Sequence, residues 1–267
     1  MTHSTVPAPR PATVPANHRF VVGIVVGALV SLGVVAIALG SGAATRLAAV
    51  PLGPIETRAY AQAFDGANQA SVRLQFGAGD LSVAALEPGN TNLATATFSG
   101  RSSYAPAPEY RVRDNVGELA YLVRDAKFGL PIFRGDEHAR LDVRLAQNTP
   151  LMLNVEAGAA ASLLDLTALQ VTHLDQQTGV ADTRVRLPEA AGQTSVSARG
   201  GVTDLTFEVP QGVAADIHVS DGMASRQIDE RRFRPMGGGH YRSADYETAA
   251  NRVDLHIELG IATLTIR

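Results

Sequence analysis

One unit recurs along this chain: a glycine followed by residues that alternate between apolar and polar. Alternation with a period of two is typical of a half-buried β-strand. The unit occurs five times, as GAGDLSV, GAAASLLDL, GVADTRVRLP, GVTDLTFEVP and GIATLTI, beginning at Gly77, Gly158, Gly179, Gly201 and Gly260. Six residues beyond each glycine the side chain is apolar: Val83, Leu164, Val185, Phe207 and Ile266. The pattern predicts stacked strands with a glycine at each corner, where backbone freedom lets the chain turn.

The spacing of the central units sets the size of one repeat. Gly158, Gly179 and Gly201 are 21 and 22 residues apart, which is room for two strands and two turns. Two stretches, residues 88–137 and residues 222–251, interrupt the regular spacing of the repeats. The first contains a predicted hairpin of Tyr110–Val112 against Leu119–Val123. We therefore predict an all-β fold, either a repetitive β-solenoid or a flattened β-sandwich of short strands, with repeats of about 21 residues.

The N-terminal part has a different character. Residues 20–40 carry no charge and only Ser31 as a polar side chain; as a helix they would span about 30 Å, one hydrocarbon thickness. We predict one transmembrane helix. The alternative is a cleaved signal peptide, because small residues follow at 40–44, although its apolar core is typically shorter. Gly23 and Gly27 form a GxxxG pattern, which allows a homodimer through paired helices.

The domain organisation follows from this segment. We predict a disordered tail over residues 1–19, the transmembrane helix over 20–40, a linker over 41–54 and a repetitive β domain over 55–267. Arg10 and Arg19 precede the helix, while Arg46 and the more distant Arg58 follow it. This slight excess of positive charge favours a cytoplasmic N-terminus and an extracytoplasmic β domain.

Composition and motifs exclude several functions. A net charge of −3 and a pI near 6.2 leave no basic footprint for nucleic acid. The chain has no cysteine, no HxxxH or HExxH metal spacing and no GxSxG elbow. The GAGDLS string lacks the third glycine of a dinucleotide loop, because Ser82 stands there. His218 and His256 occupy the polar phase of their strands and should face solvent. We predict no catalytic residues and no cofactor.

Three aspartates are candidate calcium ligands. Asp80, Asp182 and Asp204 each follow their glycine by three residues and should point outward. Stacked repeats would bring the second and third close together, where a cation could screen their charges. The alternative is that aspartate suits a turn by bonding nearby backbone amides. That alternative is favoured, because the acidic nonapeptide spacing of calcium-binding solenoids is absent.

The order of these strings is similar to that of a known family. The succession LDLTALQVTHLDQQTGVADTRVRLP, GVTDLTFEVPQGVAADIHV and ANRVDLHIELGIATLTI resembles the toast-rack domain, the LiaF-like C-terminal region of bacterial cell-envelope stress-response membrane proteins. That domain is related to an adhesin-like β-repeat family. The resemblance covers roughly residues 70–267 and implies a repetitive all-β domain beside a membrane segment, with a binding or scaffolding role and no catalytic residues.

Two functional hypotheses result. The first is a non-enzymatic, single-pass, membrane-anchored β domain that acts as a scaffold or sensor accessory in the bacterial envelope by binding an envelope protein or a ligand. The second is a surface adhesin or a solenoid that binds or processes cell-wall polysaccharide. The first is preferred, because polysaccharide sites need grouped carboxylates and exposed aromatics. The chain has 8 Phe, 6 Tyr and no Trp, and no strand pattern shows an outward aromatic row.

Overall fold

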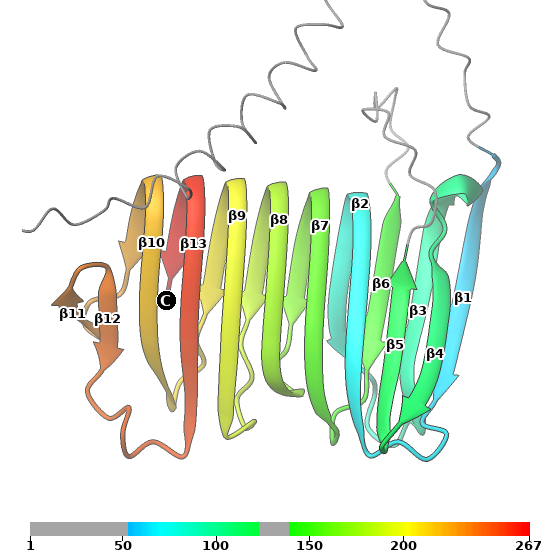
Figure 1. Ribbon diagram of the computed structural model, residues 1–267, viewed down its shortest axis with the longest axis horizontal. Helices are drawn as coiled ribbons and strands as arrows, with labels where there is room; N and C mark the ends of the chain where they lie inside the picture. Colours follow the sequence, from blue (N-terminus) through cyan, green and yellow to red (C-terminus); the bar gives the residue numbers. More distant parts are fainter. Residues whose placement is uncertain (1–52, 123–138) are drawn as a thin grey trace, which may run out of the picture. The chain divides into compact units, whose positions relative to one another are not determined.

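The computed structural model describes residues 53–122 and 139–267, and within them the fold is all-β (Figure 1). Thirteen strands form one mixed sheet in this part of the chain. They are β1 (Ile55–Ala63), β2 (Gln69–Ala85), β3 (Asn92–Arg101), β4 (Ala107–Arg113), β5 (Val116–Leu122), β6 (Arg140–Leu145), β7 (Pro150–Asp165), β8 (Gln170–Arg186), β9 (Gln193–Glu208), β10 (Val213–Ile228), β11 (Phe233–Gly237), β12 (His240–Ser243) and β13 (Asn251–Ile266). The all-β prediction is confirmed.

Six long strands make up the body of the domain. In the order β2, β7, β8, β9, β13, β10 they lie side by side, each parallel to the next. Each bends near its middle, so that its two halves lie in two layers (Figure 1). The pairing of β2 shows this directly: Gln69–Gln75 pair with β5, whereas Asp80–Ala85 pair with β6. The prediction of short strands is wrong, because each glycine lies inside one strand of 16 or 17 residues.

The bend is lined by a ladder of glycines, for a reason the sequence did not reveal. A Cβ added to Gly158 would lie 2.4 Å from the carbonyl oxygen of Gly77, and one added to Gly179 would lie 2.8 Å from that of Gly158. Gly201, Gly260 and Gly222 continue the ladder in the same way. None of these six has a positive φ. The predicted need for backbone freedom is therefore wrong: at the five glycines after Gly77, glycine is required because the neighbouring carbonyl occupies the space of a side chain.

The core lies between the two layers. The apolar residues six positions after the five predicted glycines are all buried, as the alternation predicted. In the other layer, register-paired residues of the six long strands form one continuous buried row: Val72, Leu153, Leu174, Val196, Leu255 and Ile217. Burial of each such side chain contributes about 1.5–3 kcal/mol. The repeats therefore hold together by stacking apolar rows across strands that are distant in sequence.

The two ends of the stack are closed by shorter strands. The predicted hairpin is confirmed as the antiparallel pair β4 and β5, which extends one layer beside β2. At the other end β12 pairs with β10, and β11 pairs with β12. The interruption predicted from residue 222 begins later, because β10 runs through Gly222 to Ile228. The last strand in sequence, β13, lies between β9 and β10.

The predicted transmembrane segment, residues 20–40, lies outside the described residues, as do Gly23 and Gly27. Among the residues that the structure describes, no helix has the length and apolar character needed to cross a membrane.

Candidate functional site

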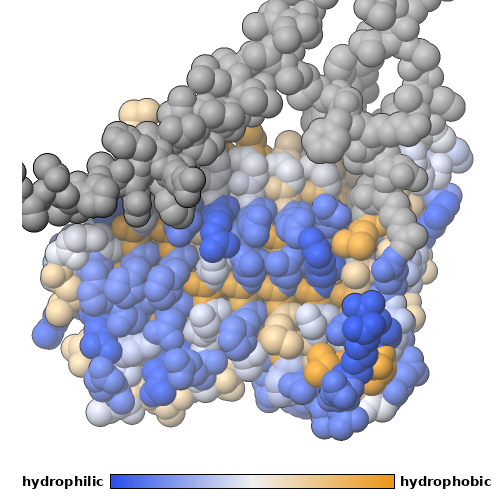
Figure 2. Space-filling view, in the orientation of Figure 1, coloured by the Kyte–Doolittle hydropathy of each residue, from blue (hydrophilic) through white to orange (hydrophobic). Residues whose placement is uncertain are grey.

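A pair of Asp-x-His tripeptides marks the strongest candidate site. Asp216 and His218 lie on β10, and Asp254 and His256 lie at the matching positions of β13. Parallel pairing aligns Asp216 with Asp254 and His218 with His256. All four side chains lie on the outer face of the layer formed by the first halves of the long strands, because the residues between them are buried. Figure 2 shows that this face is largely hydrophilic.

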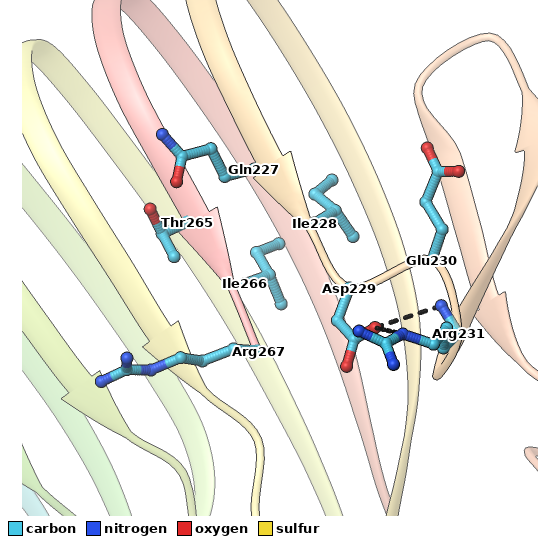
Figure 3. Close-up of a pocket in the computed structure, with 8 residues that line it drawn as sticks. All are labelled: Gln227, Ile228, Asp229, Glu230, Arg231, Thr265, Ile266 and Arg267. Atoms are coloured by element: carbon cyan, nitrogen blue, oxygen red, sulfur yellow. Dashed lines mark hydrogen bonds and ion pairs between the residues drawn. The ribbon is translucent and has the colours of Figure 1, made fainter.

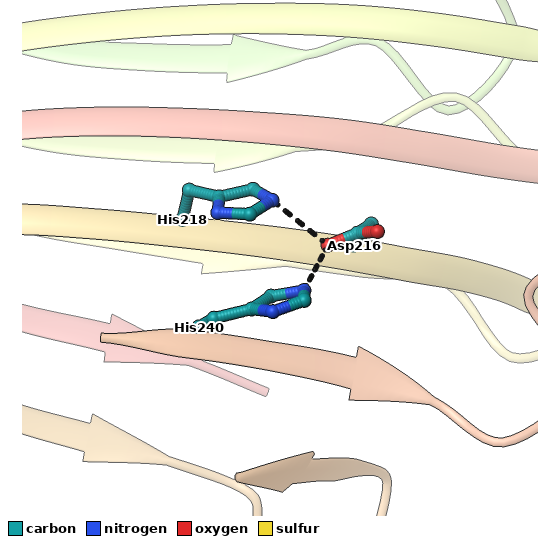
Figure 4. Close-up of side chains that lie close together, drawn as sticks. All are labelled: Asp216, His218 and His240. Carbon is teal, nitrogen blue, oxygen red and sulfur yellow. Dashed lines mark hydrogen bonds and ion pairs between the residues drawn. The ribbon is translucent and has the colours of Figure 1, made fainter. Parts of the chain in front are cut away.

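The short strand β12 adds a third histidine. It pairs antiparallel with β10 and sets His240 opposite His218. Their rings stack with centroids 4.2 Å apart, and His256 stacks on the other side of His218 at 5.1 Å. Both His218 and His240 direct Nε2 at one carboxylate oxygen: Asp216 Oδ1 lies 3.2 Å from His218 Nε2 and 2.6 Å from His240 Nε2 (Figure 4). Two imidazoles, one from β10 and one from β12, thus converge on one oxygen atom.

The second oxygen of Asp216 is held by an arginine. Arg242 Nε lies 3.1 Å from Asp216 Oδ2, and the Arg242 guanidinium carbon lies 4.5 Å above the centre of the Tyr246 ring. The pKa of Arg242 is raised, mainly because its guanidinium donates a hydrogen bond to Glu247, so the guanidinium remains charged. Burial, followed by the hydrogen bond that Tyr246 donates to Asp254, raises the pKa of Tyr246. Arg242 therefore forms an ion pair with Oδ2, while Oδ1 faces the imidazoles.

The donor set defines what this cluster can do chemically. The ligand atoms of Asp216, His218 and His240 lie within 4.8 Å of one another, the one group of three or more metal-ligating side chains found within residues 53–122 and 139–267. Asp216 is partly buried, with a side chain only 16 % exposed, while His218 lies at the surface. Two imidazole nitrogens and a carboxylate suit a divalent transition metal ion. The same oxygen can also simply accept hydrogen bonds from two neutral imidazoles.

The predicted calcium ligands lie elsewhere, on the layer formed by the second halves of the strands. Asp182 and Asp204 are register partners on β8 and β9, and both are exposed. Asp80 lies one strand further away, because β7 places Ala161 between it and Asp182. Its carboxylate lies 3.4 Å from Arg140. The structure thus brings two of the three aspartates together and separates the third; it does not test whether they bind calcium.

An apolar ridge runs beside the glycine ladder. We give this name to Val180, Val202, Ile261 and Met223, which each follow a ladder glycine by one residue. They are register neighbours on β8, β9, β13 and β10, and each is between 52 % and 71 % exposed. Asp182 and Asp204 flank the ridge on the same outer face. Contiguous exposed apolar rows are typical of interaction surfaces.

A depression at the far ends of β10 and β13 is a weaker candidate (Figure 3). Gln227–Arg231 and Thr265–Arg267 line it. Three of its four charged groups are engaged already: Arg231 pairs with Asp229 at 4.0 Å, and Arg267 pairs with Glu208 at 2.5 Å. Ligand sites usually combine an apolar wall with a few convergent polar groups. This depression lacks that arrangement.

The surface position of His218 and His256 was predictable from the sequence, whereas their assembly with His240 was not. His218 and His256 do face outward, as the alternation indicated. The available signal was the repeated Asp-x-His tripeptide at 216–218 and 254–256, which places carboxylate and imidazole on one face of each strand. His240 gave no such signal, because its position depends on the return of β12 to β10.

Fold and site together define a two-layer domain of stacked parallel β-repeats with one histidine and aspartate cluster near its end. The model of the N-terminal domain of toast_rack (DUF2154) matches residues 53–208, and the chain belongs to this family. The toast-rack resemblance drawn from the sequence is confirmed. A search of the curated proteins gives no match.

A solved structure shares this architecture. A candidate cell adhesion protein from Clostridium sporogenes is similar with a TM-score of 0.74 and 20 % identity, over 80 % of this chain and 99 % of that one. A candidate adhesin from Bacteroides fragilis covers 80 % of this chain and 97 % of its own, with a TM-score of 0.35 and 10 % identity. At this identity, the first similarity shows a common fold.

Proposed function

We propose that this protein is a non-enzymatic binding module of the bacterial cell envelope, a scaffold or sensor accessory that contacts another envelope protein. In this proposal residues 20–40 anchor the chain in the membrane as a single span and the β domain lies on the extracytoplasmic side. Membership of the toast-rack family supports a binding role. The observation that carries the proposal is the apolar ridge.

The ridge has the properties of a surface made for a partner. Its four side chains lie on successive strands about 4.8 Å apart, so they form a straight row. Exposed apolar side chains that occur singly need no explanation, but a register-aligned row across four strands exposes a contiguous apolar strip to water. A partner that covers this strip gains the free energy of removing it from water.

The charges beside the ridge indicate which kind of partner. Asp182 and Asp204 flank the row with two carboxylates on adjacent strands. An anionic lipid surface would be repelled by these groups, whereas a protein surface with basic residues beside an apolar strip would complement them. The partner is therefore a protein with an apolar strip bordered by Lys or Arg.

Site-specific crosslinking tests the proposal in the full-length, membrane-expressed chain. A photoreactive residue at Val202 should capture one defined protein, and the same residue at Val112, an exposed valine on β4, should not. The substitutions Val180→Ser and Ile261→Ser should abolish capture at Val202 while the melting temperature stays unchanged. Equal capture at both positions, or capture that survives these substitutions, would count against the ridge as a docking surface.

The adhesin hypothesis remains the alternative, and the fold shared with the candidate cell adhesion protein favours it. An adhesin would bind intact cells or a polysaccharide and leave no stable crosslink to a protein of its own envelope.

A topology reporter fused after Arg267 tests the side of the membrane: activity on the cytoplasmic side would contradict the extracytoplasmic placement.

A further inference from the structure

We propose that Asp216, His218 and His240 bind a divalent transition metal ion, and that the ion ties the terminal hairpin of β11 and β12 to β10. The proposal is independent of the apolar ridge, which lies beside the glycine ladder, whereas the cluster lies on the layer formed by the first halves of the strands. It uses no residue of the ridge.

The distances between the donor atoms fit one metal ion. Zinc is bound by imidazole nitrogen at about 2.0–2.1 Å, so two ligand atoms of a tetrahedral site lie about 3.3 Å apart. Asp216 Oδ1 and His218 Nε2 are 3.2 Å apart, close to that separation. Asp216 Oδ1 and His240 Nε2 are 2.6 Å apart and must separate by less than about 1 Å. The two rings, which are inclined to each other by 12°, must also turn toward each other so that both nitrogen lone pairs point at one ion.

The donor types decide between metals. Nitrogen ligands disfavour Ca²⁺ and Mg²⁺, which take oxygen ligands, and favour Zn²⁺ or a neighbouring transition metal. The chain has no cysteine, so thiolate competition within it is excluded. Three protein ligands leave at least one coordination position open to water or to a group of a partner.

The surroundings support a cation at this point despite the nearby arginine. Arg242 pairs with Asp216 Oδ2 and leaves Oδ1 available, the orienting role that groups around a metal site commonly take. Asp254, the register partner of Asp216, places a second carboxylate on the neighbouring strand. Asp254 is itself held by the hydroxyl of Tyr246, and Glu247 engages Arg242 on its outer side. His256 stacks against His218 and limits its movement.

The ion would link β12 to β10 at the end of the repeat stack. β12 pairs with β10 at only three positions, Asp216 with Arg242, Ile217 with Tyr241 and His218 with His240. Two ligands come from β10 and one from β12. Binding therefore links a short strand with few ladder contacts to the last long strand, and should slow its local opening.

Zinc titration of the full-length chain in detergent, after treatment with a chelator, tests the proposal. We expect one Zn²⁺ per chain by calorimetry, with no binding of Ca²⁺ or Mg²⁺ at the same concentrations. His218→Gln with His240→Gln should abolish binding, as should Asp216→Asn, which preserves size and removes the charge. His173→Gln is the matched control, an exposed histidine on β8 that should bind zinc like the unaltered chain.

Hydrogen exchange gives a second readout that does not depend on the variants. Zinc should slow amide exchange in residues 240–243 and leave β1 and β3 unchanged. Stoichiometric zinc binding that persists in the double histidine variant would overturn the assignment. An unaltered chain that retains no zinc at saturating concentration would show that Asp216 only accepts hydrogen bonds from the two imidazoles.

Discussion

At the residue scale, the glycine ladder explains why one residue type recurs at the bend of each long strand. Each ladder glycine except Gly77, the first, faces the carbonyl oxygen of the glycine on the neighbouring strand, which occupies the space that a Cβ would need. A side chain there would have to displace the backbone of a whole repeat, because the obstructing atom belongs to the main chain. The ladder therefore sets how closely the repeats can stack at the bend.

Gly158→Ala should destabilise the domain. The new Cβ would lie 2.4 Å from the Gly77 carbonyl oxygen, and overpacking of this kind costs about 1–3 kcal/mol. The free energy of unfolding from urea denaturation measures the effect. Gly77→Ala is the matched control at the same bend, because a Cβ there meets nothing within 4 Å. The control should change the stability by less than about 1 kcal/mol, and in the stabilising direction. Equal losses from both substitutions would refute the steric account.

At the element scale, a row of alternating charges ties consecutive coils together where their strands end. Asp165, Arg186 and Glu208 are register partners on β7, β8 and β9, and Arg267 follows β13. Arg186 lies 3.0 Å from the carboxylates of both Asp165 and Glu208, and Arg267 lies 2.5 Å from Glu208. Each charge thus has an opposite charge on the neighbouring strand, which favours this register over a slip by one residue.

The charge row predicts a pH-dependent effect of Arg186→Gln. Burial opposes ionisation of Asp165, yet hydrogen bonds from Thr167 and Arg186 outweigh it and lower its pKa. Hydrogen bonding from Arg267, then Arg186, lowers the pKa of Glu208. A carboxyl whose pKa is lowered by folding stabilises the fold above its unfolded pKa, and this contribution is lost as the pH falls through the folded value.

The melting temperature of Arg186→Gln should therefore fall below that of the unaltered chain near pH 7, by a difference on the order of 1–3 °C. The difference should shrink below about pH 4.5, the ordinary pKa of a glutamate, and disappear once both carboxyls are protonated. Arg184→Gln is the control, because Arg184 reaches Glu208 only at 3.8 Å and should have a smaller effect. A difference that stays constant down to pH 2 would mean that Arg186 acts through packing alone.

At the scale of the whole molecule, the local pattern predicted what each repeat is and could not predict which repeats are neighbours. The alternation after five glycines gave the strands and their buried face, because both follow from the period of a strand. Gly222 is the sixth member: Ile228 stands six residues after it as in the other units, but Arg226 between them breaks the apolar alternation, so the local pattern did not reveal it. The insertion of β13 between β9 and β10, and with it the site of His240, depends on long-range pairing that no local periodicity encodes.

The position of β13 predicts how the chain tolerates truncation. β13 pairs with β9 along one edge and with β10 along the other, although β10 precedes it in sequence. A chain that ends at Ala249 would leave both strands without their common partner and would expose two long parallel edges together with the apolar side chains that β13 covers. We expect this truncated chain to aggregate or to lose protection of β10 in hydrogen exchange.

A chain that ends at Pro210 provides the comparison. It loses more residues, yet it exposes only the edge of β9, because β10 to β13 are absent together. If stability depends on nearest-neighbour stacking of repeats, the shorter chain should be more soluble and more resistant to proteolysis than the chain that ends at Ala249. A chain ending at Ala249 that unfolds cooperatively at the temperature of the full-length protein would show that β10 finds its place without β13, and would refute this account of the fold.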